Sequence, residues 1–171
     1  MNNIIRYLFI SITTLLISAT SLAAHHEEKA EKAEKNLVQV AANNSDFQTL
    51  VMTLKAADLV GTLEGKGPFT LLAPLDEAFE KLPEGALAQL LDPENKEQLQ
   101  AVLTYHLLPG ALTAEEIAKL KLPETIQGST VTVENNDGDI TINGAKILIP
   151  DIPASNGVIH IVDTVLIPAE E

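Results

Sequence analysis

The sequence contains no cysteine, no tryptophan and only one arginine, Arg6, among its 171 residues. Without cysteine the chain cannot form disulfides, offer a thiolate nucleophile or carry a lipid at a cleavage site. Lysine and arginine total 11 against 24 acidic residues, for a formal net charge of −13 at pH 7. Nucleic-acid binding requires a basic face, so this charge excludes it. The charge fits a cationic partner, and its plainer interpretation is a well-solvated surface.

Residues 1–23 have the pattern of a cleaved export signal. Arg6 provides the positive start, residues 7–17 form a mainly apolar run, and small residues follow at Ser21 and Ala23. The run is shorter than the roughly 20 apolar residues that a spanning helix needs. We therefore predict cleavage after Ala23, which gives a soluble, secreted or periplasmic protein with no membrane span.

Residues 24–36 mix glutamate and lysine without an apolar face, which predicts a mobile tail that is dispensable for folding. Cleavage would place Ala24, His25 and His26 at its start. A free amine, two backbone amides and a third-position histidine can form a square-planar nitrogen site for Cu(II) or Ni(II). These three residues are the candidate metal site, and the alternative is a polar tail that binds metal only incidentally. We predict no cofactor.

The rest of the chain changes from a helical to a strand period. Helical spacing and capping residues (Ser45, Asp76, Asp92 and Thr113) predict helices near residues 37–41, 47–54, 76–82 and 93–106, and a further helix that begins after Thr113. Apolar runs and alternation predict strands at residues 69–73, 130–134, 140–142, 146–149 and 158–162. Because helices dominate the first half and strands the second, we expect one α+β domain rather than a parallel doubly wound fold.

Three stretches, in order, resemble motifs of a known family. Residues 69–79 resemble the first signature motif of the fasciclin (FAS1) domain, Tyr105-His106 its tyrosine–histidine motif, and residues 154–168 its second signature motif. The resemblance runs over residues 37–168 and fits the single-domain secreted bacterial type. It implies a FAS1-like fold, a twisted β-wedge flanked by several short α-helices. It also implies an extracellular adhesion or binding module rather than an enzyme.

The chain departs from the family pattern at Leu75, where threonine is usual, which leaves Asp76 as the evident helix cap. Residues 149–153 correspond to a segment assigned to integrin recognition in animal members of the family. The Pro-Asp-Ile core fits that segment and the flanking residues do not. By this resemblance Asp151 and Ile152, with Tyr105 and His106, are the candidate partner-binding residues. We expect the two prolines of the segment to hold its backbone extended.

The polar residues of these motifs do not predict a catalytic site. Ser155, His160 and Asp163 occur in triad order, but an extended chain would separate Ser155 from His160 by about 16 Å. Tyr105 and His106 lie on an apolar helix face, and His160 shares an apolar strand face. We interpret all three as buried, hydrogen-bonded core residues, with contact to a ligand as the alternative reading.

The sequence thus favours an exported FAS1-like binding or adhesion module that contacts a protein or polysaccharide at or outside the cell surface. The alternative is a periplasmic Cu(II)- or Ni(II)-binding protein that uses the Ala-His-His start of its mature chain. We predict that the protein is not an enzyme.

Overall fold

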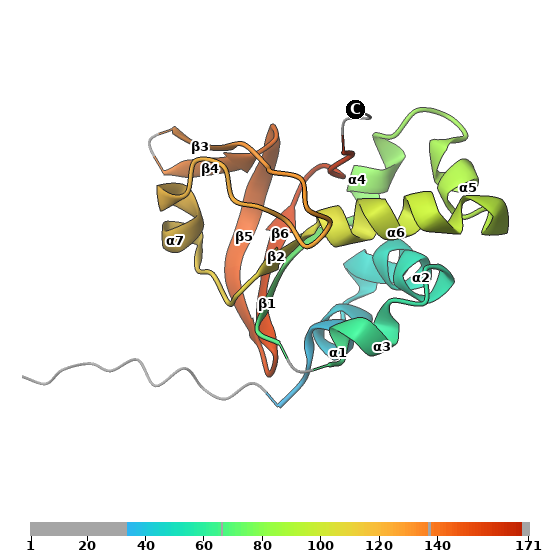
Figure 1. Cartoon of the computed structure of the whole chain (residues 1–171), viewed down its shortest axis with the longest axis horizontal. Helices are drawn as coiled ribbons and strands as arrows, with labels where there is room; N and C mark the ends of the chain where they lie inside the picture. Colours follow the sequence, from blue (N-terminus) through green and yellow to red (C-terminus); the bar gives the residue numbers. More distant parts are fainter. Residues whose placement is uncertain (1–33, 66, 137, 169–171) are drawn as a thin grey trace, which may run out of the picture.

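The computed structural model describes residues 34–65, 67–136 and 138–168, which form one mixed six-stranded sheet with helices against both of its faces (Figure 1). The helical elements are α1 (Leu37–Ala42), η1 (Ser45–Phe47), α2 (Gln48–Ala56), α3 (Val60–Leu63), α4 (Asp76–Glu80), α5 (Ala86–Leu90), η2 (Pro93–Asn95), α6 (Lys96–Tyr105) and α7 (Ala114–Lys119). The strands are β1 (Phe69–Pro74), β2 (Leu107–Pro109), β3 (Val133–Asn136), β4 (Asp139–Ile142), β5 (Ala145–Ala154) and β6 (Gly157–Val162).

The sheet has the strand order β2-β1-β6-β5-β4-β3. Strands β1 and β6 are parallel and are paired from Phe69–Gly157 to Pro74–Val162. The other neighbouring strands are antiparallel. The two signature motifs, far apart in sequence, therefore lie side by side in the sheet. This arrangement confirms the α+β prediction.

Two apolar cores cover the two faces of the sheet. Alternation along β1 sends Leu71 and Ala73 toward helices α1–α6, whereas Leu72 points to the opposite core. That second core includes Ile117 of α7 and Val131 of the loop that follows it. Figure 1 shows this division, with α1–α6 gathered on one side of the strands and α7 on the other. Each large apolar side chain buried here stabilises the fold by roughly 1.5–3 kcal/mol.

The predicted caps at Ser45 and Asp76 are wrong. Asn44 caps η1 by accepting a hydrogen bond from Asp46 N–H at 3.1 Å, while the Ser45 hydroxyl donates to the Asp46 carboxylate. Asp76 is the first residue of α4, which has no side-chain cap, and its Oδ1 accepts from Thr49 N–H of α2 at 2.8 Å. Asp76 therefore caps a different helix, 27 positions earlier in the chain.

Two other predicted helix starts are confirmed. Asp92 accepts a hydrogen bond from Glu94 N–H ahead of Pro93, the first residue of η2, which leads into α6. Thr113 and Glu116 form a reciprocal capping box at the start of α7. The hydrogen bonds from Thr113 are the largest influence on the Glu116 carboxyl and hold its pKa below the ordinary value.

The strand predictions need two corrections. The strand expected at residues 130–134 begins only at Val133, because Val131 N–H donates to the Pro123 carbonyl and Thr130 bridges Glu124 instead of joining the sheet. The strand expected to end at residue 149 continues through both prolines to Ala154. It can do so because β5 contains register shifts that leave residues out of the ladder.

A junction at the second motif joins three parts of the chain. Asn156 Oδ1 accepts from Leu37 N–H at 3.0 Å, and its Nδ2 donates to the Leu63 carbonyl at 2.6 Å. Gly157 lies so close to β1 that a Cβ atom there would sit 1.9 Å from the Phe69 carbonyl oxygen. The motif therefore needs asparagine and glycine at these positions for structural reasons.

The ordered contacts begin before residue 37, where the domain was expected to start. The Lys35 carbonyl accepts from Ser155 N–H at 2.8 Å, and Asn36 forms a capping box with Gln39 at the start of α1. Residues 24–33 of the expected tail lie outside the described part. Within that part, no helix is long and apolar enough to cross a membrane.

Candidate functional site

His106 ends α6 and is only 2% exposed. Its Nδ1 lies 2.7 Å from the Val102 carbonyl oxygen, and its Nε2 accepts from Leu166 N–H at 2.9 Å. A carbonyl can only accept and an amide N–H can only donate, so the partners fix a neutral ring protonated on Nδ1. Burial lowers the pKa of His106 to about 4, against the opposing effect of the Val102 hydrogen bond. Both ring nitrogens thus connect α6 to the segment after β6.

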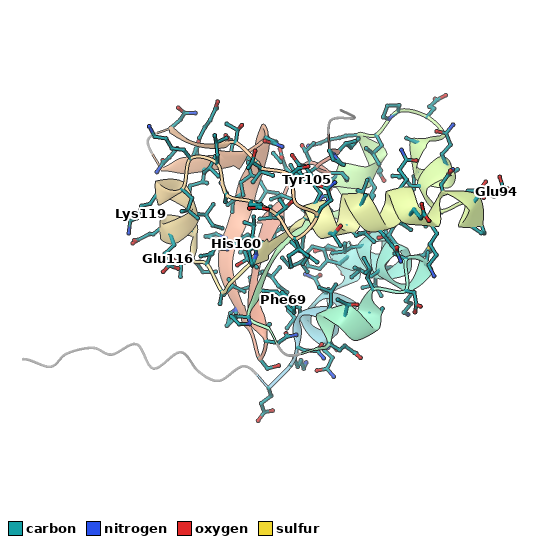
Figure 2. The ribbon with its side chains drawn as sticks, viewed as in Figure 1. Phe69, Glu94, Tyr105, Glu116, Lys119 and His160 are labelled. Carbon is teal, nitrogen blue, oxygen red and sulfur yellow. The ribbon has the colours of Figure 1, made fainter. Side chains whose placement is uncertain are left out.

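Tyr105 is also buried and bonded internally (Figure 2). Its hydroxyl accepts from Asn143 Nδ2 at 2.6 Å and donates to the Thr130 carbonyl at 3.2 Å. The tyrosine–histidine motif thus contributes its polar atoms to hydrogen bonds within the fold. Of the candidate partner-binding residues, Tyr105 and His106 are the two that the structure places in the interior.

His160 is fully buried on β6, on the face that points toward the loop before α7. Its Nε2 lies 2.8 Å from the Leu112 carbonyl oxygen, and its Nδ1 accepts from Asp151 N–H at 3.2 Å. Burial lowers the pKa of His160, while the Leu112 hydrogen bond and the nearby Asp151 charge oppose that effect. The partners again specify a neutral ring, here protonated on Nε2.

Asp151 lies on the surface, but its polar groups are bonded to the domain. Its Oδ1 accepts from Ala114 N–H, at the first residue of α7, at 2.9 Å. Its φ of 59° is in the left-handed region, so the expected extended backbone of this segment is interrupted at Asp151, although β5 continues through both prolines. The cause is the register shift between Ile149 and Ile152, where β5 bulges away from β6. Ile152 itself is half-buried and pairs with Ile159.

The exposed surface of this region is apolar and lies just before Asp151. Leu148 is 45% exposed and Ile149 is 52% exposed, and Pro150 follows them at the surface. We call Leu148, Ile149, Pro150 and Asp151 the β5 surface. A shallow groove adjoins it, lined by Ala114, Gly138, Asp139, Ile140, Lys146, Ile147, Leu148 and Pro150. The sequence pattern does not indicate that Leu148 is exposed, because simple strand alternation cannot show that two adjacent apolar residues are both exposed.

The structure does not assemble Ser155, His160 and Asp163 into a triad. Both His160 nitrogens bond to Leu112 and Asp151, as described above. The Asp163 carboxylate instead accepts from Lys146 N–H and the Thr164 hydroxyl, and it lies 3.5 Å from Lys81 Nζ. Partial burial raises the pKa of Asp163, but these donors and the Lys81 charge together lower it below the ordinary value.

Ala24, His25 and His26, the candidate metal ligands, lie outside the described residues. Among residues 34–65, 67–136 and 138–168, no group of three or more histidine or acidic side chains is placed to hold a metal ion. The N-terminal site therefore remains a prediction from the sequence.

The fold and these motifs define the class of protein. A model of the fasciclin domain matches residues 45–168, and the chain belongs to this family. The chain resembles a solved FAS1 domain pair from the insect cell adhesion molecule fasciclin I, with a TM-score of 0.71. That match covers 80% of this chain and 52% of the other, at 19% identity, and it shows the shared fold.

Among individual proteins, the chain is similar to protein sll1483 of Synechocystis sp., with 41% identity over 152 residues. The match covers 89% of this chain and 84% of that protein. It is also similar to the cell surface glycolipoprotein MPB83 of Mycobacterium bovis, with 31% identity over 81% of this chain and 63% of that protein.

Proposed function

We propose that this protein is an exported FAS1 module that binds a protein or polysaccharide at or outside the cell surface and has no catalytic activity. The observation that carries the proposal is the β5 surface, where three consecutive apolar residues, Leu148, Ile149 and Pro150, are exposed. An apolar strip of this kind is a surface that a partner can cover. In contrast, Tyr105, His106 and His160 use their polar atoms within the fold.

Two relatives support the location and the kind of role. MPB83 is named as a cell surface protein, and fasciclin I as a cell adhesion molecule. The predicted signal at residues 1–23 independently supports export of this chain. The net charge of −13 supports a cationic partner, whose association rate would fall as salt screens the attraction.

The test is a pull-down of envelope and matrix material with the exported protein and two variants. Ile149→Ser should weaken binding at least about tenfold, because burying an isoleucine against a partner contributes roughly 1.5–3 kcal/mol. Met52→Ser is the matched control, because Met52 is 57% exposed and lies on α2, away from the β5 surface. If both variants capture the partner as well as the unchanged protein does, the assignment of the β5 surface is contradicted.

A second candidate function rests on the sequence Ala24-His25-His26 alone. We propose that the mature chain binds one equivalent of Cu(II) or Ni(II) through its free amine, two amides and His26. Such a site needs no folded scaffold, so it is independent of the β5 surface. Its test is a variant with two extra residues before Ala24, which puts Ala24 in the third position; a single extra residue would put His25 there and keep the site.

A further inference from the structure

The bulge in β5 lies directly opposite His160. Ile149 pairs with Ile161 and Ile152 pairs with Ile159, so Pro150 and Asp151 together face the single residue His160. Proline has no N–H, and Asp151 N–H donates to the His160 ring instead of to a strand carbonyl. The shape of the bulge therefore depends on an unprotonated nitrogen on a buried histidine.

His160 and Asp151 connect three elements. The imidazole holds the bulge of β5 through Asp151 N–H and the loop before α7 through the Leu112 carbonyl. The Asp151 carboxylate holds the start of α7 through Ala114 N–H. A change at the His160 ring would thus reach both the β5 surface and α7.

Few charged groups lie near enough to the His160 imidazole to influence its protonation. Asp151 of β5 is the charge that acts on it, and α7 contributes Glu115, Glu116 and Lys119 on its own surface. In Figure 2 the labelled Glu116 and Lys119 lie out on α7, whereas His160 lies within the ribbon. Strand β1 and residues 110–113 carry no titratable side chain.

Protonation of Nδ1 would place its new hydrogen against Asp151 N–H. The two donors repel, and Asp151 starts from a left-handed backbone conformation that non-glycine residues rarely adopt. An imidazolium would attract the nearby Asp151 carboxylate, whose Oδ1 accepts from Ala114 N–H. Acid therefore removes the hydrogen bond from Asp151 N–H to the ring and weakens the hydrogen bond from Ala114 N–H to the carboxylate.

We propose that His160 is a positioning residue that makes the β5 surface sensitive to pH. Its neutral ring holds the bulge in place by accepting from Asp151 N–H, and protonation releases Asp151 and the start of α7. We call this arrangement the latch. The role of this latch in partner binding rests on the proposed function. The expected consequence is a different arrangement of Leu148 and Ile149 in acidic surroundings.

The test is a nuclear magnetic resonance titration of the exported, ¹⁵N-labelled protein, with no partner present. The His160 ring nitrogens and the amides of Asp151 and Ala114 should shift together, with one midpoint below the ordinary histidine pKa of about 6.5. Asp151→Asn keeps an oxygen for Ala114 N–H but removes the charge that stabilises the imidazolium, so this midpoint should move to lower pH. His106→Gln should leave it unchanged.

Three results would overturn the latch. The first is a His160 titration during which the amides of Asp151 and Ala114 do not move. The second is an unchanged midpoint in Asp151→Asn, and the third is loss of all amide signals together before His160 titrates. The titration uses the protein alone. If the pull-down finds no partner, the proposed function is contradicted, but the titration still tests the role of His160.

Discussion

Acidification should destabilise the protein through His106. The size of the effect follows from the difference between the pKa of His106 in the folded and unfolded chain. The folded protein holds the pKa of His106 at about 4, because the ring is buried and bonded in its neutral form. In the unfolded chain the pKa returns to about 6.5. As pH falls below about 6.5 the unfolded state takes up this proton first, so the free energy of unfolding decreases until the folded state also protonates near pH 4.

The difference of roughly 2.5 pKa units, at 1.36 kcal/mol per unit, corresponds to about 3 kcal/mol between pH 7 and pH 4. His106→Gln should remove this part of the pH dependence, because the glutamine amide can accept from Leu166 N–H and does not titrate. At pH 7 the variant should itself be about 1–3 kcal/mol less stable, since the Val102 carbonyl loses its donor.

The assay is urea unfolding followed by circular dichroism, since the chain has no tryptophan to report by fluorescence. Comparing the variant with the parent protein at each pH cancels the contributions of carboxylates and of His160. Tyr105→Phe is the control: it removes a buried hydroxyl beside His106 and should keep the full pH dependence. If the free energy of unfolding of His106→Gln falls between pH 7 and pH 4 by as much as that of the parent protein, the reasoning is refuted.

Four further predictions follow from the sequence and the fold. Gly157→Ala should destabilise the domain by more than about 3 kcal/mol in urea unfolding, because the new Cβ atom would meet the Phe69 backbone. The control Gly61→Ala has open space at its Cβ and should not lower the free energy of unfolding. Equal destabilisation by the two variants would contradict the packing argument. Intact mass of the exported protein should show cleavage after Ala23, and a species that keeps residues 1–23 would refute it. Deleting residues 24–33 should leave the melting temperature nearly unchanged, and a clear drop would show that the tail packs on the domain. Cu(II) titration should give one equivalent. Two residues added before Ala24 should abolish it, because Ala24 then takes the third position, and unchanged binding in that variant would place the site elsewhere.

Local sequence patterns predicted those parts of the fold whose determinants are local. Thr113 and Glu116 cap a helix three residues apart, and the mainly apolar run at residues 158–162 forms a strand that is buried on both faces. The cap of Asp76 could not be predicted in this way, because its partner Thr49 is brought to it only by tertiary packing. The continuation of β5 past Pro150 was missed for a related reason: a bulge removes the need for the N–H that proline lacks.

The candidate site was predicted less completely than the fold. The sequence correctly suggested that Tyr105, His106 and His160 are buried, because each lies among apolar residues at the period of its helix or strand. It could not show that Asp151 is bonded to Ala114, 37 positions away, which makes Asp151→Ala unsuitable as a binding-only variant. The exposure of Leu148 and Ile149 depends on the same bulge and became visible only in three dimensions.

The central claim, that this protein binds a partner through an exposed surface, is tested most directly by surface-binding kinetics on envelope and matrix extract. The account predicts saturable binding of the exported protein, an association rate that falls as salt rises, and weaker binding by Ile149→Ser than by Met52→Ser. The absence of any saturable partner, or turnover of a small substrate that is lost on mutating His160 or Asp163, would contradict it.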